Sequence, residues 1–327
     1  MPSTVAKPYL HVVAAVIHHP RDPSKVFLAQ RKAGQHLEHK WEFPGGKLEA
    51  GEPRFHGLRR EIAEEIGVHI QTAHPLILLR HTYPEKRILL DTWRVTAFQD
   101  EPRSLEGQKT TWVDTRKLDE YDLPDADGPI VQALQLPEEI LITPDVDPAQ
   151  SAAFVEQFAR VMLRHPFCLV SFRAHGLDDE RYAELAATLQ TITHAAGGEL
   201  ILHRRSMAAV EQPRFANYRN WHLDSRALHE IQPRGRMAGL KLSASCHDAQ
   251  DLRQAKAIGC RFAYLSSVRH TASHPGRPAK GWREFGKLAR QAGLPVYALG
   301  GIKRGDLMAA HYQGATGVAG IRDFWSA

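Results

Sequence analysis

Cysteine is scarce in this chain, with three residues among 327, and no CxxC pair occurs. Cys168, Cys246 and Cys260 are odd in number and stand in apolar surroundings, which argues against a disulfide framework or a zinc site. No run of about 18 apolar residues and no charged leader with an apolar core is present, which argues against a membrane span or a secretion signal. These absences predict a cytoplasmic protein with buried thiols.

Long basic tracts are also missing, although the formal net charge is +5 and the isoelectric point is near 9.1. Lys and Arg are dispersed among acidic residues, so we expect no stable nucleic-acid binding, whereas a modest positive charge suits phosphorylated ligands. A chain of 327 residues exceeds the usual domain length of about 100 to 200 residues. A Pro- and Asp-rich segment at 136–150 then favours two domains, 1–137 and 138–327.

The most specific segment of the sequence is GKLEAGEPRFHGLRREIAEEIGV, residues 46–68. Pro53 suits the first turn of a helix and Gly67 suits its end, so the segment predicts one short helix behind a glycine turn. On that helix three carboxylates are one, three or four residues apart and form an acidic cluster, which repels itself unless a cation is present. They are Glu61, Glu64 and Glu65. Hard oxygen ligands favour Mg²⁺, with Mn²⁺ as the alternative.

This segment resembles the Nudix box, GX5EX7REUXEEXGU with U aliphatic, and it meets every fixed position. The matching residues are Gly46, Glu52, Arg60, Glu61, Ile62, Glu64, Glu65, Gly67 and Val68. Nudix enzymes hydrolyse a nucleoside diphosphate linked to another group. The resemblance therefore implies a metal-dependent pyrophosphohydrolase, in which cations neutralise the phosphates and water attacks.

The resemblance also implies a role for each residue of the site. Glu61 and Glu65 match metal ligands and Glu64 shares the metal, while the backbone carbonyl of Gly45 completes the metal shell and Arg60 holds a carboxylate through a bidentate contact. The general base varies within the family and stays open here. The further candidates beside the box are Glu106 as base and Lys47 as a phosphate ligand.

The flanks HVVAAVIHHP, VFLAQRKAG and WEFPGGK resemble the MutT type of Nudix protein, which converts 8-oxo-dGTP to the monophosphate and pyrophosphate. Arg31, His36 and Phe43 match its nucleotide-side positions. The segment LPDADGPIVQAL matches the stretch that carries an amide reading the oxidised purine, but Asp127 stands there in place of Asn. An ionised carboxylate only accepts hydrogen bonds, whereas an amide donates and accepts.

Hydrophobic periodicity predicts strands at 11–17, 26–30, 76–82, 88–98 and 111–114, with helices at 53–66 and 128–136. Strands flanked by two helices indicate an α/β/α sandwich for the first domain. Beyond 138 the pattern alternates eight strands with helices, which predicts a (β/α)8 barrel of the TIM type. Such barrels bind ligands at the carboxyl ends of their strands, and the loop with Gly300 and Gly301 is a candidate phosphate loop.

The second half resembles the thiamine phosphate synthase and thiazole tautomerase superfamily, from ILITPD through HLD and SCH to ALGGI. A synthase of that family binds pyrophosphate and Mg²⁺ through acidic, Asn and Lys positions. Cations and His occupy these positions here: His203, Arg204, Arg226 and His274. Because Arg cannot ligate a cation, the comparison implies a degenerate barrel without synthase activity.

Two readings of the barrel stay open. In one, His247 matches a family His that shuffles protons, and the barrel isomerises a thiazole phosphate while the first domain hydrolyses a thiamine-pathway diphosphate. In the other, Arg173 and His203 belong to a cationic mouth that binds a phosphorylated thiamine-pathway ligand without catalysis and regulates the first domain. The leading interpretation remains 8-oxo-dGTP hydrolysis.

Overall fold

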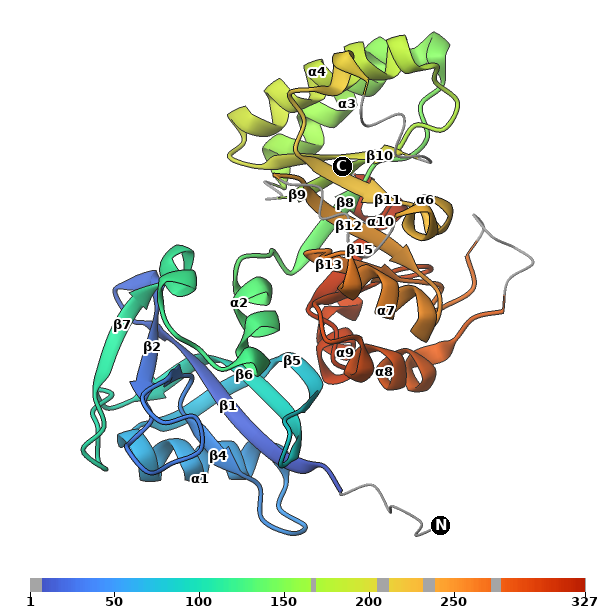
Figure 1. Cartoon of the computed structure of the whole chain (residues 1–327). Helices are drawn as coiled ribbons and strands as arrows, with labels where there is room; N and C mark the ends of the chain where they lie inside the picture. The colour runs from blue at the N-terminus through green and yellow to red at the C-terminus, as the bar shows by residue number, and fades with distance from the viewer. Residues whose placement is uncertain (1–7, 166–168, 205–211, 232–238, 272–277, 327) are drawn as a thin grey trace, which may run out of the picture. The chain divides into compact units, whose positions relative to one another are not determined.

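The computed structural model describes residues 8–165, 169–204, 212–231, 239–271 and 278–326 (Figure 1). Cys168 and His274 lie outside the described residues, as does the side chain of Arg204. The chain divides into two compact units, Met1–Gln135 and Leu136–Ala327.

The first unit is built on one seven-stranded sheet with the order β3-β2-β1-β6-β5, in which β4 also pairs with β1 and β7 with β2. The central pair, β1 and β6, is parallel, and the other pairs are antiparallel. The strands are β1 (Leu10–His19), β2 (Asp22–Gln30), β3 (Trp41–Glu42), β4 (Gly45–Lys47), β5 (His69–Thr82), β6 (Arg87–Gln99) and β7 (Thr110–Asp114).

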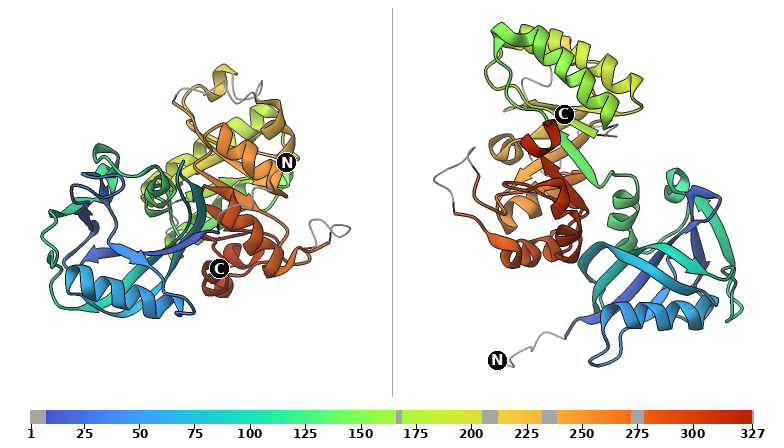
Figure 2. Two further views of the ribbon diagram at one scale, coloured as in Figure 1. Left: turned by 60° about the horizontal axis from the view of Figure 1, so that its bottom comes forward. Right: turned by 180° about the vertical axis from the view of Figure 1, so that it is seen from behind.

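A helix covers each face of this sheet. Successive side chains of the central strand β1 point to opposite faces, so alternate residues pack in two different cores. Val13, Ala15 and Ile17 pack in one core with helix α1 (Arg54–Ile66), whereas Ala14 and Val16 pack in another with α2 (Gly128–Leu134). Figure 2 shows the two helices on opposite sides of the strands. The predicted α/β/α sandwich is confirmed.

The second unit is a closed barrel of parallel strands with the order β10-β11-β12-β13-β14-β15-β8-β9, which confirms the predicted TIM-type architecture. Its strands are β8 (Glu139–Ile142), β9 (Leu169–Phe172), β10 (Glu199–Arg204), β11 (Asn220–Leu223), β12 (Lys241–Cys246), β13 (Phe262–Leu265), β14 (Val296–Ala298) and β15 (Gly317–Gly320). Its helices are α3 (Ser151–Arg164), α4 (Asp179–Ala195), α6 (Ser225–Glu230), α7 (Ala249–Ala257), α8 (Gly281–Ala292), α9 (Leu307–Tyr312) and α10 (Arg322–Trp325).

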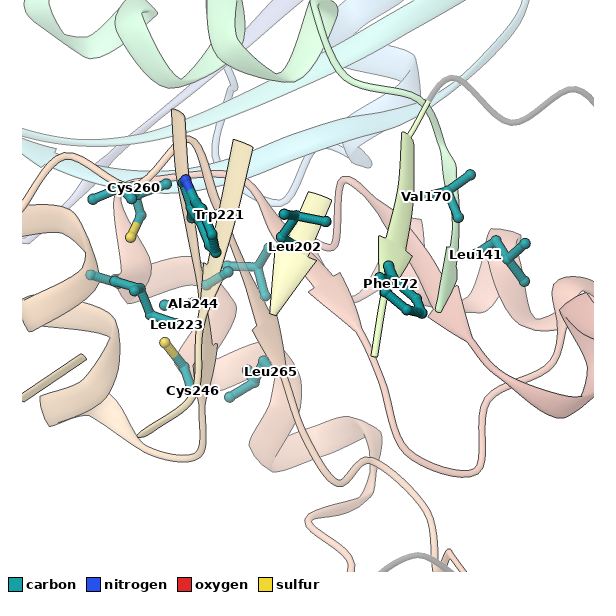
Figure 3. Packing of buried hydrophobic residues seen from close by; sticks show 14 of the residues in the cluster. Leu141, Val170, Phe172, Leu202, Trp221, Leu223, Ala244, Cys246, Cys260 and Leu265 are labelled. Atoms are coloured by element: carbon teal, nitrogen blue, oxygen red, sulfur yellow. The ribbon is translucent and has the colours of Figure 1, made fainter. Parts of the chain in front are cut away.

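Two sets of side chains alternate along the barrel strands. One set packs with the helices, and Figure 3 shows strand residues of this core such as Phe172, Trp221 and Cys246. The other set, with Ile201 and Tyr264 among its members, forms a separate core cluster. Because this second set occupies the alternate strand positions, it lies inside the barrel.

Cys246 and Cys260 are buried and free, and burial raises the pKa of the Cys260 thiol to about 12, so this side chain is an apolar packing group at neutral pH. Among the residues that the structure describes, no helix combines the length and the apolar character that crossing a membrane requires.

Candidate active site

The glycine turn before α1 brings a carboxylate against bare backbone. Gly46 pairs with Val13 of β1, and a Cβ atom added to Gly46 would lie 2.1 Å from Oε2 of Glu61. A Cβ atom on Gly45 would lie 2.1 Å from the carbonyl oxygen of Val13. A side chain at Gly45 would therefore clash with the backbone of β1, and one at Gly46 would displace the Glu61 carboxylate.

Glu65 faces the same turn from one helical turn further along α1. Its carboxylate accepts a hydrogen bond from the backbone N–H of Gly45 at 2.7 Å and one from the Gln108 amide at 3.2 Å. Burial raises the pKa of Glu65 to about 7, and the negative charges of Glu42 and Glu106 add to the effect. A carboxylate in this environment is poorly compensated by the protein alone.

Arg60 donates hydrogen bonds to the other three carboxylates of the box. Its Nε and one terminal nitrogen donate to the two oxygens of Glu52 at 3.0 and 2.8 Å, which is a bidentate contact. The other terminal nitrogen lies 2.9 Å from Glu61 and 3.3 Å from Glu64. These hydrogen bonds from Arg60 lower the pKa of Glu52 to about 2, so this carboxylate stays ionised. Arg60 thus fixes where the acidic face points.

The acidic residues meet in one cleft of about 230 Å³. Its walls include Gly45, Glu61, Glu64, Glu65, Glu106 and Gln108. Glu106 comes from the loop before β7 and forms an ion pair with Lys32 at 3.0 Å. The structure therefore brings together from separate segments the carboxylates singled out in the sequence.

The donor set suits a hard divalent cation. Carboxylate oxygens from one helix and one loop converge beside a peptide group, and Mg²⁺ and Mn²⁺ prefer such oxygens. The raised pKa of Glu65 points the same way, because like charges and burial make its ionised form costly until a cation compensates it.

A second cavity of about 200 Å³ shares Arg31, Glu42 and Gly45 with the acidic cleft. The nucleotide-side candidates all line this cavity: Arg31, His36, Phe43, Lys47 and Asp127. We call it the base pocket. Arg31 forms an ion pair with Glu42 and donates through Nε to the carbonyl oxygen of His36 at 2.6 Å, which holds the guanidinium at the junction of the two cavities.

The walls of the base pocket are partly core residues. Phe43 is 4% exposed, belongs to the core cluster under α2 and also lines the pocket. His36 donates or accepts at Nδ1 with Glu85 at 2.6 Å, while its Nε2 atom is buried and has no hydrogen-bond partner in the described part of the chain. This nitrogen is available to a ligand.

Several residues at the site were not anticipated from the sequence. Glu42, Gln108 and Tyr83 contribute charge, a hydrogen bond and an aromatic wall, respectively. Glu42 and Gln108 stand in segments already singled out, WEFPGGK and SLEGQ, which was the available signal. Tyr83 lies in the β5–β6 hairpin, where no motif marks it.

A neutral polar cluster lies on the barrel strands β11 and β12. His222 of β11 lies 3.0 Å from Ser243 Oγ and 2.8 Å from Ser245 Oγ, so both hydroxyls already have partners. Burial lowers the pKa of His222 to about 3. Its ring lies at a tilt against that of His203, with a centroid distance of 4.3 Å. Both imidazoles are neutral, because burial also lowers the pKa of His203.

Two polar atoms in this region lack partners among the described residues. Nε2 of His203 and Nε of Arg173 are both buried without a hydrogen bond. Arg173 and His203 come directly after Phe172 of β9 and Leu202 of β10, which pair with each other on neighbouring strands. Arg173 also forms an ion pair with Asp145 through a terminal nitrogen.

The other barrel candidates have structural partners of their own. His247 lies with Nδ1 3.2 Å from both the carbonyl oxygen and the hydroxyl of Ser266. Gly300 and Gly301 adopt positive φ angles of 93° and 68°, and a Cβ atom on Gly300 would lie 2.8 Å from Cα of Ser267. Close packing against the loop after β13 therefore accounts for a glycine at 300.

Comparisons with known proteins match the two units separately. Residues 13–133 match the family described as NUDIX domain, and residues 140–324 match the family described as thiamine monophosphate synthase. The 8-oxo-dGTP diphosphatase of Escherichia coli (strain K12) is 32% identical over 126 residues, which are 38% of this chain and 96% of the relative. The CTP pyrophosphohydrolase of the same organism is 33% identical, over 38% of this chain and 90% of its own.

A relative of the second unit is the putative thiamine-phosphate synthase 2 of Aquifex aeolicus (strain VF5). It is 25% identical over 171 residues, which are 52% of this chain and 89% of the relative. The synthase family match by itself covers more than half of the chain. The chain therefore belongs to the Nudix hydrolase family in its first unit and to the thiamine monophosphate synthase family in its second.

Proposed function

We propose that the first unit is a divalent-metal-dependent pyrophosphohydrolase that converts 8-oxo-dGTP, or a related oxidised purine nucleoside triphosphate, to the monophosphate and pyrophosphate. The observation that carries the proposal is the junction of the two cavities. The acidic cleft and the base pocket share Arg31, Glu42 and Gly45, so one nucleotide can place its phosphates in the first cavity and its base in the second.

The chain's own residues supply position and charge. Arg60 orients Glu61 and Glu64, while the Gly45 N–H and Gln108 orient Glu65. A bound divalent cation would neutralise phosphate charge and lower the pKa of the attacking water. Glu61, Glu64 and Glu65, with the backbone carbonyl of Gly45, are the proposed ligands.

Lys47 and Glu106 complete the proposed machinery. Lys47 directly follows the glycine turn and lines the base pocket, and its ammonium is a proposed phosphate ligand. Glu106 lies outside the box helix and is a candidate general base together with the box carboxylates. The base is the carboxylate whose removal lowers kcat without changing the Mg²⁺ concentration needed for half-maximal rate.

Product analysis tests this function. The full-length protein with Mg²⁺ and 8-oxo-dGTP should release 8-oxo-dGMP and pyrophosphate, and Glu61→Gln should lower kcat/KM by at least about 100-fold. The variant keeps the shape of the side chain, so an unchanged circular dichroism spectrum is the control. Release of 8-oxo-dGDP and orthophosphate, or full activity of Glu61→Gln, would contradict the proposal.

The barrel supports a second, separate function. Two buried nitrogens, on Arg173 and His203, have no hydrogen-bond partner among the described residues. They favour a ligand that accepts hydrogen bonds, and a phosphorylated thiamine-pathway metabolite fits this requirement. Cations and neutral imidazoles at the mouth suit binding better than Mg²⁺-dependent synthesis. The barrel would then act as a binding module, with proton transfer by His247 as the catalytic alternative.

Equilibrium binding separates these possibilities. Thiamine phosphate titrated into full-length Glu61→Gln should bind, and adding Arg173→Ala should weaken binding by about 10-fold or more. Turnover of a thiazole phosphate that is lost in His247→Ala would establish the catalytic alternative. Binding that Arg173→Ala leaves unchanged would remove the proposed anion site.

A further inference from the structure

Asp127 is a buried acid on the wall of a cavity. It is 7% exposed and lines the base pocket beside Phe43 and Tyr83. It directly precedes α2, yet its side chain makes no capping hydrogen bond to that helix. Within the described residues no hydrogen bond or ion pair reaches its carboxyl group. A polar group of this kind is rare in a folded protein unless a ligand completes it.

The charges around Asp127 do not compensate it. Glu42 from β3 contributes a like charge, and Arg31, the nearby cation, is already paired with Glu42 and bonded to the His36 carbonyl. Burial therefore raises the pKa of Asp127 well above its ordinary value, the Glu42 charge adds to the rise, and Arg31 opposes it. The other titratable groups on the pocket walls are His36, Lys47, Tyr83 and Lys86.

Tyr83 is affected in turn by this acid. Burial raises the pKa of the Tyr83 phenol to about 12, with the negative charges of Asp127 and Asp125 as further causes. The phenol therefore remains a neutral hydroxyl. Tyr83 and Phe43 both contribute aromatic rings to the pocket walls, and a buried carboxylate without a hydrogen bond is costly to ionise there.

We propose that Asp127 recognises the base as a neutral carboxylic acid, donating through its O–H and accepting through its C=O. The inference rests on the proposed function, because it takes this cavity as the base site. A neutral acid complements any base edge that offers an acceptor beside a donor. Such edges include the N–H and C=O pair of an oxidised purine and the amino group and ring nitrogen of cytosine.

An ionised Asp127 would read a different edge of the base, one that 8-oxoguanine shares with guanine and that cytosine lacks. A carboxylate only accepts, so it requires two adjacent donors, such as N1–H and the amino group of guanine. Asparagine offers one donor and one acceptor, like the neutral acid, and has the same shape. Leucine offers neither. These three side chains therefore distinguish the two forms of Asp127 by binding alone.

The experiment is isothermal titration calorimetry of the full-length protein with 8-oxo-dGMP and with CMP, which need no hydrolysis. At pH 6, Asp127→Asn should bind 8-oxo-dGMP within about 3-fold of the wild type, and Asp127→Leu should bind at least about 10-fold more weakly. CMP should bind detectably to the wild type. At pH 9 the wild type should bind no more tightly than Asp127→Asn, which serves as the control for every other titrating group, the base included.

Four results would overturn the inference. The first two are an affinity for 8-oxo-dGMP at pH 6 that falls by about 10-fold or more in Asp127→Asn, and an affinity of Asp127→Leu equal to that of the wild type. The third is a wild type that binds at least about 3-fold more tightly than Asp127→Asn at pH 9. The fourth is that neither monophosphate binds. A failure of the proposed function can be distinguished from a failure of the inference about Asp127. If the protein binds as expected but does not hydrolyse 8-oxo-dGTP, the hydrolase assignment fails and the inference about Asp127 stands.

Discussion

Glu65 combines the two features that a metal ligand in a partly buried cleft needs. Its backbone and amide hydrogen bonds fix its position, and its neighbours Glu42 and Glu106 make its charge unfavourable. Positioning by the protein and compensation by a cation are therefore separate contributions at this residue. The pH dependence of stability can separate them.

Without metal, Glu65 should make the protein less stable as the pH rises. Its folded-state pKa of about 7 lies above the ordinary value of 4.5, so the folded state keeps a proton that the unfolded state has released. The free energy of unfolding then falls between pH 4.5 and 7, by about 3 kcal/mol at most. Urea unfolding in EDTA at pH 5 and pH 8 should show this fall in the wild type and a smaller one in Glu65→Gln. Equal falls in both proteins would contradict the raised pKa.

Arg60 should matter through its geometry as well as its charge. Arg60→Lys keeps the cation but loses the fork that holds Glu52 and reaches Glu61 and Glu64 at the same time. We expect kcat to fall by about 10-fold or more with less than about 3-fold change in KM, because the substrate's own contacts remain. Steady-state kinetics at saturating Mg²⁺ measures this. A variant that raises only KM would place Arg60 in substrate binding.

For single residues, the sequence predicts which side chains lie together when one helix fixes their spacing. Glu61, Glu64 and Glu65 are neighbours on any α-helix, so their cluster follows from spacing alone. Glu42 and Tyr83 reach the site only through the tertiary arrangement of a two-residue strand and a hairpin, and no local period marks either of them.

Among the elements, α1 depends on an anchor at its first turn. Arg54 donates to both oxygens of Asp91, which is fully buried on β6, and its guanidinium lies 5.3 Å from the centroid of Trp93. Burial alone would raise the pKa of Asp91, but the hydrogen bonds from Arg54 and His11 outweigh it and hold that pKa below its ordinary value. The pair joins the helix that carries the acidic face to the centre of the sheet.

Asp91→Asn should destabilise the first unit by about 2 to 4 kcal/mol, because it removes one partner of a buried ion pair. Asp100→Asn is the matched control, since Asp100 forms an exposed pair with His69 and has a positive φ angle of 71°, which Asn tolerates. We expect the control to change stability by less than about 0.5 kcal/mol. Urea unfolding at pH 7 compares the two. Similar losses of unfolding free energy in both variants would show that the buried Arg54–Asp91 pair contributes no more than an exposed ion pair.

Element boundaries show where hydrophobic periodicity stops being informative. The predicted helix at 53–66 agrees with α1, because Pro53 and the left-handed Gly67 mark its two ends. Strand β5 begins at His69, earlier than the predicted 76, since register shifts near Ile70 and Pro75 interrupt its alternation. Strands β3 and β4 are too short to show any period, although they carry the glycine turn.

At the scale of the whole molecule, two families are joined in one chain, and the site residues of each lie within its own unit. The barrel interior is filled by side chains that contact one another: the hydroxyls of Tyr264 and Ser171 share a hydrogen bond of 2.8 Å, and the Tyr264 ring contacts that of His222 at a centroid distance of 4.8 Å. Such a filled interior could be predicted from alternating strands. The neutral state of His222 and His203 could not, because it results from the degree of burial that the closed barrel imposes on them.

Synthase activity should be absent from the full-length protein. With hydroxymethylpyrimidine diphosphate, thiazole phosphate and Mg²⁺, we expect no thiamine phosphate above the level of a no-enzyme blank, because cations and His replace the acidic ligands that hold the metal in the family. Chromatographic detection of thiamine phosphate checks this. Formation that survives Glu61→Gln would contradict the degenerate barrel.

The central claim is that the first unit reads an oxidised purine and cleaves its triphosphate. The most direct test is kcat/KM for 8-oxo-dGTP against dGTP, CTP and thiamine diphosphate, with Glu61→Gln as the blank. We expect a preference for 8-oxo-dGTP over dGTP of about 100-fold, which corresponds to about 2.7 kcal/mol of transition-state discrimination. Equal rates with dGTP, or a preference for thiamine diphosphate, would contradict it.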